Sequence, residues 1–296
     1  MTEKICLTGG SGFLSWAFIE KVLPEGLFLP LRQRSPALSN AKIFESFADV
    51  DWGQHFDNER VVGVINTAAM SNPVECHAHP EQSHWVNVEW PLYLGQLCRE
   101  RSIPCVHFSS DLVFDGQADL YGDQAQANPL SLYGEQKAEV EKRLPEIYPE
   151  SWICRLPLLF GESGVGSKNG WASWIEKAHS GLKQPLFVDE FRSAIRTSRV
   201  ADFVLSRLGE LSGVMNVGGP KGISRYEMGE AVCDVFDLNS SCISPSSLEE
   251  LNLSPPRPPR LILDSSQAES EGLESLSFKE ELLEIQKGGG WLREPS

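Results

Sequence analysis

The chain lacks the features that mark membrane, secreted and nucleic-acid-binding proteins. No apolar run approaches the length of a membrane span. The first ten residues, MTEKICLTGG, have neither the charged start nor the small-residue cleavage site of a secretory signal. The net charge of -15 at pH 7 argues against a nucleic-acid partner, because phosphate binding needs a concentrated basic face. A small anionic ligand is still compatible, since a few arginines and a helix N-terminus can bind a diphosphate within an acidic protein.

The seven cysteines do not form the pattern of a disulfide framework. Their number is odd, they are widely spaced, and most lie in apolar stretches, which favours reduced thiols in a core. We therefore expect a cytoplasmic protein. With 296 residues, of which 41% are hydrophobic, the chain is long enough for one large domain or two small ones.

Short apolar runs alternate with amphipathic stretches in the first half of the chain. This pattern is typical of strand-helix-strand units and predicts an α/β fold with a doubly wound parallel sheet. Pro30 cannot donate to a ladder, so the second strand should be short or irregular. Residues 244–259, rich in Ser, Pro and Glu, are expected to form a surface loop. The expected strands span 4–8, 27–31, 61–66, 104–109, 152–156 and 214–217, and the expected helices 15–23, 81–101, 132–144, 171–181 and 225–236.

The segment KICLTGGSGFLSWAF joins a buried strand directly to a helix through a glycine-rich turn. Gly9, Gly10 and Gly12 allow the backbone to turn tightly and approach a pyrophosphate, while the helix start offers amide donors and a partial positive charge. This is the setting that the dinucleotide-binding fingerprint requires, so we predict a Rossmann-type sheet that binds a nicotinamide cofactor here. Ser15 stands at the third glycine position of the motif. An ordinary strand-to-helix turn is the alternative.

Cofactor selectivity in such sites depends on the residues just after the second strand. An NAD-selective site usually offers an acidic residue there for the ribose 2′-hydroxyl. This chain reads LPLRQRSP, with Arg32 and Arg34 and no acid. We expect these arginines to meet a 2′-phosphate, which favours NADPH; NADH is compatible if both are solvated surface side chains.

A tyrosine and a lysine four residues apart are the main catalytic candidates. In LSLYGEQKAEVEKRL, Tyr133 and Lys137 lie on one face of an expected helix, and such a lysine lowers the pKa of the tyrosine by favouring the phenolate. The preceding HFSSDLVFDG places Ser109 and Ser110 at the carboxyl end of a strand, the edge where such sheets bind ligands. Ser110 could then hydrogen-bond the carbonyl that Tyr133 protonates. The alternatives are an exposed helix face and a capped turn.

Taken together, these motifs make the chain resemble the extended short-chain dehydrogenases, and among them the sugar-nucleotide reductases typified by dTDP-4-dehydrorhamnose reductase. The resemblance rests on TGGSGFLS, NTAA, SSDLVFDG, PLSLYGEQK, CRLPLLFG, RTSRVAD and GVMNVGG, which occur in the family's order over nearly the whole chain. It implies an NAD(P)-binding domain over residues 1–160 and a smaller C-terminal substrate lobe over 161–296. Residues 213–219 would return to the Rossmann sheet.

The resemblance also implies roles for individual residues, with Ser110, Tyr133 and Lys137 as the catalytic group. Contacts to the cofactor would come from Gly9, Ser11, Gly12, Phe13, Leu14, Arg32, Arg34, Asn66, Ala68, Ala69, Asn87, Ser109, Tyr133 and Lys137. Contacts to the nucleotide sugar would come from Asp111, Val113, Phe114, Arg192 and Arg196. Together with Arg199, the last two arginines could clamp a diphosphate, or all three could be solvated on the surface.

The segment after Ser110 lacks the acid pair that related dehydratases use to eliminate water, because Asp111 is followed by Leu112 and Val113. This favours simple reduction of a keto group on a nucleotide sugar, with Tyr133 giving the proton. Two alternatives stay open. One is a non-catalytic regulatory subunit resembling the methionine adenosyltransferase beta subunit, which would act through a protein partner. The other is a nucleotide-sugar epimerase; a homodimer is compatible with either enzyme.

Two further groups of residues carry weaker signals. His77, His79 and His84 lie close together, but no cysteine or carboxylate cluster completes a tetrahedral set, so we expect no metal site. Trp171 or Trp174, beside the glycine-rich GESGVGSKNG, could stack on a nucleotide base, although packing is the simpler role for a tryptophan.

Overall fold

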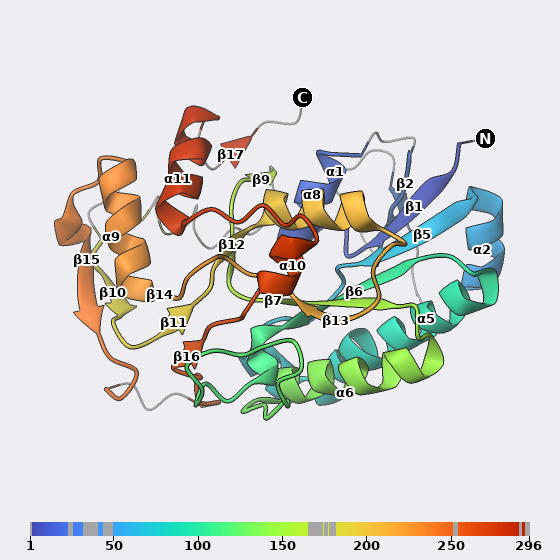
Figure 1. Cartoon of the computed structure of the whole chain (residues 1–296), viewed down its shortest axis with the longest axis horizontal. Helices are drawn as coiled ribbons and strands as arrows, with labels where there is room; N and C mark the ends of the chain where they lie inside the picture. Colours follow the sequence, from blue (N-terminus) through green and yellow to red (C-terminus); the bar gives the residue numbers. More distant parts are fainter. Residues whose placement is uncertain are drawn as a thin grey trace.

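The computed structural model describes residues 2–22, 26–31, 41–43, 50–164, 174, 177, 182–250, 254–289 and 292–293. Within these residues, the main body is a six-stranded parallel sheet with helices on both faces (Figure 1). The strands lie in the order β13-β7-β6-β5-β1-β2. Their bounds are β1 (Lys4–Thr8), β2 (Leu27–Phe28), β5 (Val61–Asn66), β6 (Cys105–Ser110), β7 (Trp152–Leu156) and β13 (Gly213–Asn216).

The strand order has a switch point between β1 and β5. From β1 the chain runs outward to β2 on one side and then returns to β5 on the other, and all of these pairs are parallel. A doubly wound sheet leaves a crevice at the carboxyl ends of two such strands, and ligands bind there. The predicted α/β class, a Rossmann-type doubly wound sheet with a smaller C-terminal lobe, is therefore confirmed.

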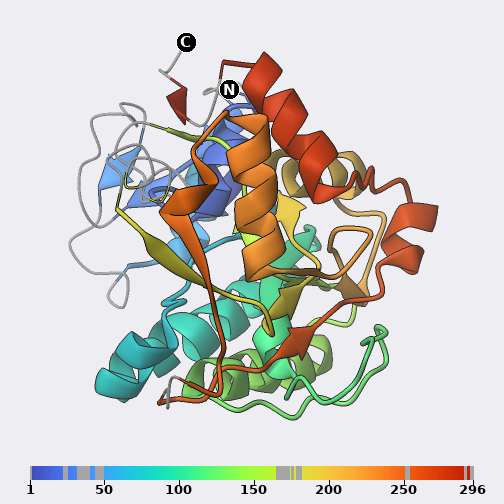
Figure 2. The same cartoon turned by 90° about the vertical axis from the view of Figure 1, so that its left-hand side faces the viewer.

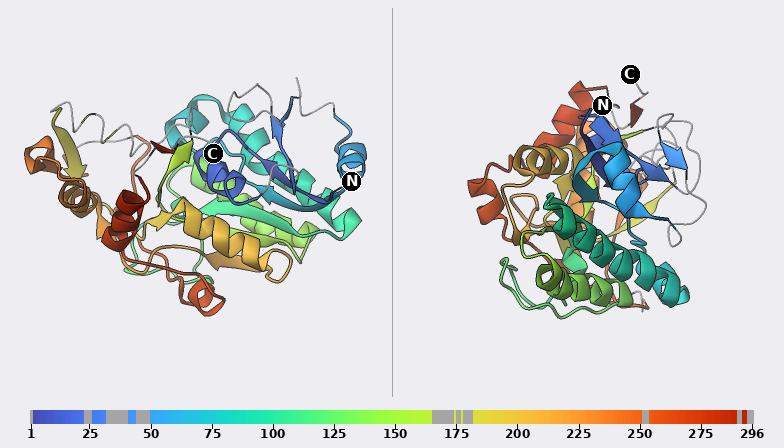
Figure 3. Two further views of the ribbon diagram at one scale, coloured as in Figure 1. Left: turned by 90° about the horizontal axis from the view of Figure 1, so that it is seen from above. Right: turned by 90° about the vertical axis from the view of Figure 1, so that its right-hand side faces the viewer.

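Helices cover both faces of the sheet, which explains why β6 and β7 are buried along their whole length (Figures 1 and 3). On one face α1 packs against α8, and Phe18 of α1 lies 6.0 Å from Phe108 of β6 between ring centroids. On the other face α5 packs against α6. The bounds are α1 (Phe13–Ile19), α8 (Thr197–Arg207), α5 (Trp90–Arg101) and α6 (Leu132–Ile147).

The second strand is interrupted, as Pro30 predicts. β2 ends at Phe28, and β3 (Pro30–Leu31) pairs instead with β4 (Lys42–Ile43) in a separate two-stranded ladder. Because proline has no N–H group, the ladder there uses the carbonyl of Leu29, which accepts from the amide of Lys42 at 2.9 Å.

The helices differ from the expected ones mainly at their ends. The predicted helix over 81–101 is present as α4 (Pro80–His84), a π-helical turn (Trp85–Glu89) and α5 in direct succession. The predicted helix over 15–23 ends early, at Ile19. Five helices of the described residues were not expected: α2 (Trp52–Glu59), α3 (Pro73–Ala78), α8, α10 (Ser266–Ser270) and α11 (Phe278–Lys287). Two of them carry a clear start signal, because Asp51 and Asn72 cap the first turns of α2 and α3. Of the helix expected over 171–181, only Trp174 and Lys177 belong to the described residues, and both are helical.

The second half of the chain builds the smaller lobe beside the sheet (left in Figure 1, facing the viewer in Figure 2). The strands outside the main sheet in this half of the chain form short ladders: β10 pairs with β15, β11 lies between β14 and β16, β12 pairs with β8, and β17 pairs with β9. The bounds are β8 (Leu159–Phe160), β9 (Ser163–Gly164), β10 (Gln184–Phe187), β11 (Phe191–Arg192), β12 (Ile195–Arg196), β14 (Ile223–Ser224), β15 (Ile243–Ser246), β16 (Arg260–Leu261), β17 (Leu292–Arg293), α9 (Arg225–Val235), α10 (Ser266–Ser270) and α11 (Phe278–Lys287).

The prediction of a loop over 244–259 is wrong for residues 244–246. They belong to β15 and pair in register with β10, so that Ser244 lies opposite Pro185. Composition suggested a loop because Ser and Pro are rare in central strands, but this two-stranded ladder has an open edge that tolerates Pro245. The strand expected over 214–217 is present as β13, which pairs with β7 and so brings the second half of the chain back to the main sheet.

Two helices of the smaller lobe begin with the same local signal. Ser224 Oγ accepts from the amide of Glu227 at 3.1 Å, and Glu227 Oε2 accepts from the amide of Ser224 at 2.7 Å, which fixes the start of α9. Ser277 and Glu280 form the matching capping box of α11. In the described parts of the chain, no helix is long and apolar enough to cross a membrane.

The packing of α1 can be tested with Phe18→Ala. Because the Phe18 side chain is fully buried between α1 and the sheet, its loss is expected to lower the free energy of unfolding by about 3–5 kcal/mol. Urea denaturation measures this difference. The control, Leu283→Ala, removes a partly exposed side chain on α11 and should cost about 1 kcal/mol or less. Equal losses in the two variants would contradict the core assigned to α1.

Candidate active site

A cleft with a volume of about 630 Å³ lies at the carboxyl ends of the sheet strands. One wall comes from the turn after β1, the residues after β5, the end of β6 and the start of α6. The opposite wall comes from the smaller lobe, through Glu190, Arg192 and residues 254–258. The cleft therefore occupies the switch point of the sheet, where the fold favours ligand binding.

The glycine-rich turn after β1 requires glycine for a steric reason. Gly9 has φ +73°, and a Cβ atom there would lie 2.7 Å from the amide nitrogen of Ala68. The turn can thus approach the turn after β5, and Gly12, Phe13 and Leu14, for which cofactor contacts are predicted, line the cleft. The predicted cofactor residues Gly9 and Ser11 are not among the lining residues; Gly9 shapes the turn instead.

Ser15, which replaces the third glycine of the motif, ties the turn together. Its side chain is fully buried, and its Oγ donates to the carbonyl of Gly9 at 2.5 Å and lies 2.8 Å from Thr67 Oγ1. The serine therefore adds a hydrogen bond at a position where close packing is needed. Among the described residues, no side chain caps the amides of the first turn of α1.

Asn66 at the end of β5 joins three neighbouring strands. Its Oδ1 accepts from Thr8 Oγ1 at 2.5 Å and from the amide of Ala68 at 3.2 Å, and its Nδ2 donates to His107 Nδ1 at 3.1 Å. Asn66, Ala68 and Ala69, for which cofactor contacts are predicted, line the cleft. The hydrogen bonds hold the loop after β5 in the position that forms this wall.

Asn87 supports the same loop from behind rather than lining the cleft. Its Oδ1 accepts from the amide of Met70 at 2.9 Å, and its Nδ2 donates to the carbonyl of Met70 at 3.0 Å and to Gln136 Oε1 at 2.8 Å. Asn87, a predicted cofactor residue, therefore lies behind the cleft wall, because both polar atoms of its side chain bind the backbone of Met70.

The three catalytic candidates meet in the cleft. Ser110 ends β6, while Tyr133 and Lys137 lie in the first two turns of α6, and all three line the cleft. The Ser110 hydroxyl donates to Asp111 Oδ1 at 3.2 Å. Gly134 makes this approach possible, because a Cβ atom there would lie 2.2 Å from the carbonyl oxygen of Leu112. Helix α6 can therefore start directly against the turn that comes after β6.

Lys137 is fully buried and turned toward the strand. Its Nζ donates to the carbonyl of Phe108 at 2.9 Å, lies 3.5 Å from His107 Nε2, and is 5.8 Å from the ring centroid of Tyr133. Burial lowers the pKa of Lys137 to about 8, opposed mainly by the negative charge of Glu141.

The pKa of Tyr133 corrects one expectation. The sequence predicted that Lys137 lowers it, but burial raises it above its ordinary value, and the charge of Asp111 adds to this effect. The nearby Ser110 hydroxyl acts on this pKa in the opposite direction without overcoming burial. The phenol is therefore protonated at neutral pH in this structure, which is the state that a proton donor needs.

Asp111 and Arg192 face each other across the cleft, with Arg192 Nε 3.6 Å from Asp111 Oδ2. Burial raises the pKa of Asp111 to about 6, opposed by the charge of Arg192. The remaining N–H groups of Arg192 bind the protein itself, including the carbonyls of Phe191 at 2.7 Å and Pro258 at 2.9 Å and the carboxylate of Glu190 at 3.0 Å. Arg192, for which a substrate contact is predicted, lines the cleft, but its donors hold the wall in place and leave little for a diphosphate.

Val113 and Phe114 do not line the cleft, contrary to the substrate contact predicted for them. Both side chains are fully buried, and the Phe114 ring stacks on Tyr121 with centroids 4.2 Å apart. The reason is the short 3-10 helix Asp111–Val113, which directs Leu112 toward the cleft and Val113 into a satellite core.

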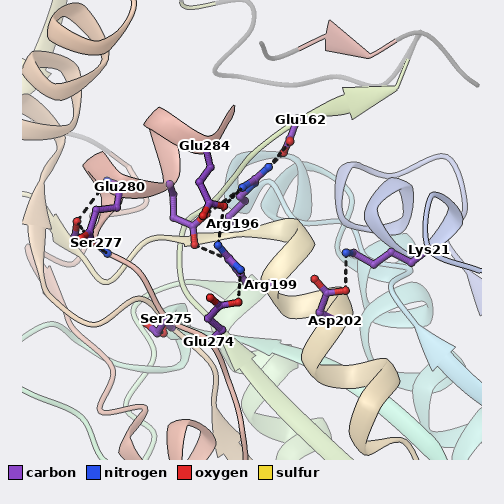
Figure 4. Close-up of polar contacts among 12 residues, drawn as sticks. Lys21, Glu162, Arg196, Arg199, Asp202, Glu274, Ser275, Ser277, Glu280 and Glu284 are labelled. Atoms are coloured by element: carbon purple, nitrogen blue, oxygen red, sulfur yellow. Dashed lines mark hydrogen bonds and ion pairs between the residues drawn. The ribbon is translucent and has the colours of Figure 1, made fainter. Parts of the chain in front are cut away.

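Arg196 and Arg199 belong to a network of carboxylates away from the cleft (Figure 4). Arg196 forms a bidentate pair with Glu162 and lies 3.2 Å from Glu281, and Arg199 Nε donates to Glu281 at 2.8 Å. Glu284 accepts from both arginines. The predicted substrate role of Arg196 is not supported, because its guanidinium is engaged in joining β12, just before α8, to Glu162 and α11.

Several other predicted residues have different outcomes. Ser109 lines the cleft, and its Oγ donates to Glu141 at 2.6 Å. Arg32, Arg34 and Trp171 lie outside the described residues. Trp174 packs in the core of the smaller lobe and does not line the cleft. Across the described ranges, no group of three or more His, Cys, Asp or Glu side chains could hold a metal ion.

The cleft also contains residues that the sequence analysis did not single out. These are mainly Glu190 and residues 71–74 and 254–258. A signal for Glu190 existed, since it is an acid two residues before Arg192 in a segment already suspected of contacting substrate. Residues 254–258 carried no such signal, because they reach the cleft only through the way the smaller lobe folds back.

Comparison with known proteins gives concordant results. Residues 3–288 match the family model described as RmlD substrate binding domain. The probable low-salt glycan biosynthesis reductase Agl14 of Haloferax volcanii is 32% identical over 228 residues, or 73% of this chain and 76% of that protein. The methionine adenosyltransferase 2 subunit beta of Bos taurus is 27% identical over 92% of this chain and 83% of its own length. The crystal structure of dTDP-4-dehydrorhamnose reductase from Bacillus anthracis in complex with NADP has a TM-score of 0.84 at 18% identity, covering 97% of this chain and 100% of that one.

The burial of Asp111 predicts a specific dependence of stability on pH. Folding raises its pKa from 3.8 to about 6, so the folded state binds the proton more tightly and loses stability as pH rises through this range. At 1.36 kcal/mol per pKa unit, the loss is roughly 3 kcal/mol between pH 4 and pH 7. Asp111→Asn should lack this part of the loss when urea denaturation is repeated at each pH.

The control for this measurement is Asp202→Asn. Asp202 is an exposed carboxylate paired with Lys21, and an exposed pair contributes less than about 1 kcal/mol at any pH. If the difference between Asp111→Asn and the wild type stays constant from pH 4 to pH 7, Asp111 is not buried as the structure shows.

Proposed function

Because the chain belongs to the RmlD substrate binding domain family, we propose that it is an NADPH-dependent reductase of a keto group on a nucleotide sugar. The observation that carries this proposal is the meeting of Ser110, Tyr133 and Lys137 in one cleft with the glycine-rich turn. Proton donor, carbonyl-binding hydroxyl and dinucleotide turn are thus the walls of a single cavity at the switch point of the sheet.

The residues on the cofactor side fit a dinucleotide. Gly9 cannot carry a side chain and Gly12 lines the cleft directly, so a pyrophosphate can approach the backbone there. Phe13, Leu14, Asn66, Ala68 and Ala69 would surround it, and Lys137 would meet the nicotinamide ribose. Arg32 and Arg34, with no acid between them, support NADPH over NADH.

The chemistry assigned to the chain's own residues is a proton transfer. A bound reduced nicotinamide supplies a hydride to the keto carbon. Tyr133 is protonated at neutral pH and donates its phenolic proton to the oxygen, while the Ser110 hydroxyl hydrogen-bonds and polarises that oxygen. The keto group thereby becomes an alcohol, and Tyr133 recovers its proton from solvent through the cleft.

Reduction is favoured over the other reactions of related folds. Elimination of water needs a second acid after the strand-end serine, and here Asp111 is succeeded by Leu112 and Val113. Val113 is also buried away from the cleft. The name of the Haloferax volcanii relative, a glycan biosynthesis reductase, supports reduction as well.

A second candidate function is a regulatory subunit that binds cofactor and acts through a protein partner. It is favoured by the likeness to the methionine adenosyltransferase 2 subunit beta of Bos taurus, which extends over 92% of this chain. The presence of Ser110, Tyr133 and Lys137 does not distinguish the two candidate functions, because a subunit that only binds cofactor could contain the same residues. Measuring catalytic turnover does distinguish them.

The proposed proton donor is tested by Tyr133→Phe. Oxidation of NADPH in the presence of dTDP-4-dehydrorhamnose, or another member of a panel of keto-sugar nucleotides, is expected to fall by about 100-fold or more, since a positioned acid contributes about 10²–10⁴ in rate. The dissociation constant for NADPH, from fluorescence titration, should change less than about threefold, because only a hydroxyl is removed.

The matched control is Tyr226→Phe, which removes a phenol from α9 outside the cleft and should leave turnover unchanged. Retained activity in Tyr133→Phe would refute its assignment. If the wild type oxidises NADPH with no member of the panel but binds a stoichiometric synthetase partner, the regulatory candidate replaces the reductase.

The preference for NADPH is tested by direct binding. The wild type should bind NADPH at least about tenfold more tightly than NADH, a difference of about 1.4 kcal/mol that charge-assisted contacts to a 2′-phosphate readily supply. Replacing Arg32 and Arg34 together by alanine should remove the preference while leaving NADH affinity nearly unchanged. A wild type that binds NADH more tightly would contradict the cofactor assignment.

A further inference from the structure

A buried ion pair lies beside the catalytic candidates. Arg155 of β7 donates through Nε to Glu141 Oε1 at 2.9 Å and through Nη2 to Oε2 at 2.8 Å, and the two side chains keep only 5% and 7% of their exposure. Arg155 Nη1 donates to the carbonyl of Asp123 at 2.8 Å, and the guanidinium stacks on the Phe114 ring at 4.9 Å. Burying two charges is costly unless the geometry is this complete, so Glu141 is held in one place.

Glu141 also reaches the strand that carries the site. Its Oε1 accepts from Ser109 Oγ at 2.6 Å, and the preceding strand residue, Phe108, accepts from Lys137 Nζ at 2.9 Å. Lys137 and Glu141 are four residues apart, so two neighbouring positions of β6 bind two successive turns of α6. This fixes the register of the helix against the end of the strand, where Ser110 and Tyr133 meet.

The charge of Glu141 acts on Lys137 as well. Burial disfavours the ammonium form of Lys137, and the Glu141 carboxylate is the largest influence in the opposite direction. The other titratable groups around Lys137 are uncharged at neutral pH, because burial lowers the pKa of His107 and raises those of Cys76 and Tyr133. The charged groups farther from Lys137 are Asp111, which lies near Tyr133 and pairs with Arg192, and Arg155, which pairs with Glu141.

We propose that Glu141 is a positioning residue for the reduction: held by Arg155 and Ser109, it fixes the part of α6 that carries Lys137 against β6 and places a carboxylate one helical turn from Lys137. The importance of Glu141 for the reaction rests on the cofactor-binding role proposed for Lys137. Glu141 itself does not line the cleft, so it acts through Lys137 rather than on the reacting atoms.

The test is a titration of Lys137 in the full-length protein by NMR of side-chain-labelled lysine, with the resonance assigned from its loss in Lys137→Met. In Glu141→Gln the midpoint is expected about one pH unit or more below that of the wild type, because the carboxylate is gone and the Arg155 charge is left unpaired nearby. The matched control is Glu139→Gln, which makes the same charge change on the outer side of α6, where Glu139 pairs with Arg143. Its midpoint should equal that of the wild type.

A second variant keeps the test decisive if Glu141→Gln does not fold. Glu141→Asp retains the carboxylate but shortens the side chain by one methylene group. The titration midpoint of Lys137 should therefore fall as it does in Glu141→Gln, but by a smaller amount. A midpoint in Glu141→Gln equal to that in Glu139→Gln overturns the proposal, whatever change in stability accompanies it. So does an unshifted midpoint in Glu141→Asp when that is the folded variant.

Failure of this proposal and failure of the proposed function are distinguishable. The NMR titration uses neither cofactor nor substrate, so it reports on Glu141 alone. Binding of NADPH to Lys137→Met reports on the role of Lys137 in holding the cofactor. Unchanged NADPH affinity there would contradict that role while the electrostatic effect of Glu141 still stood.

Discussion

Helix α6 begins within contact distance of the turn that comes after β6, and the rest of the site depends on this close approach. It is possible because residue 134 is glycine, with the carbonyl of Leu112 filling the space that a side chain would need. From that start, Tyr133 comes beside Ser110, and Lys137 and Glu141 are placed along the strand at Phe108 and Ser109. The same close packing excludes water, which shifts the pKa values of Tyr133 and Lys137 in opposite directions and keeps the proton on the phenol.

The buried arginines of this acidic chain serve mainly to hold its parts together. Arg155 fixes Glu141 one helical turn from Lys137, and Arg196 of β12 joins that strand to Glu162 and α11. Arg192 ties the wall of the smaller lobe to the carbonyl of Pro258 and to Glu190. Each guanidinium offers five donors in a rigid fork, so one residue can satisfy several carbonyls and carboxylates at once. An arginine near a cleft is therefore weak evidence for phosphate binding until its donors are counted.

Much of the fold and of the catalytic group could be predicted from the sequence, because local patterns carry them. The glycine turn, the strand ending in Ser110 and the spacing of Tyr133 and Lys137 each depend on residues close together in the chain. The wrong or untested contacts were those that depend on distant segments. Val113 and Phe114 turn inward because a 3-10 turn meets a satellite core around Tyr121, and Arg196 is taken up by Glu281, 85 residues away. The residues next to them in the sequence give no indication of these distant partners.

The sequence by itself determined the doubly wound sheet, the glycine-rich turn after β1, and the choice of Ser110, Tyr133 and Lys137 as the proposed reactive group. These depend on hydrophobic periodicity, on the steric need for glycine, and on helical spacing, all of which act over a few residues. Only the tertiary structure decided which side chains line the cleft, which arginines are free to bind, and where the protons lie. Those depend on burial and on charges brought together from distant parts of the chain. Desolvation and ion pairing have no counterpart in local sequence, so Glu141 could be identified as part of the site only after the fold had placed it beside Lys137.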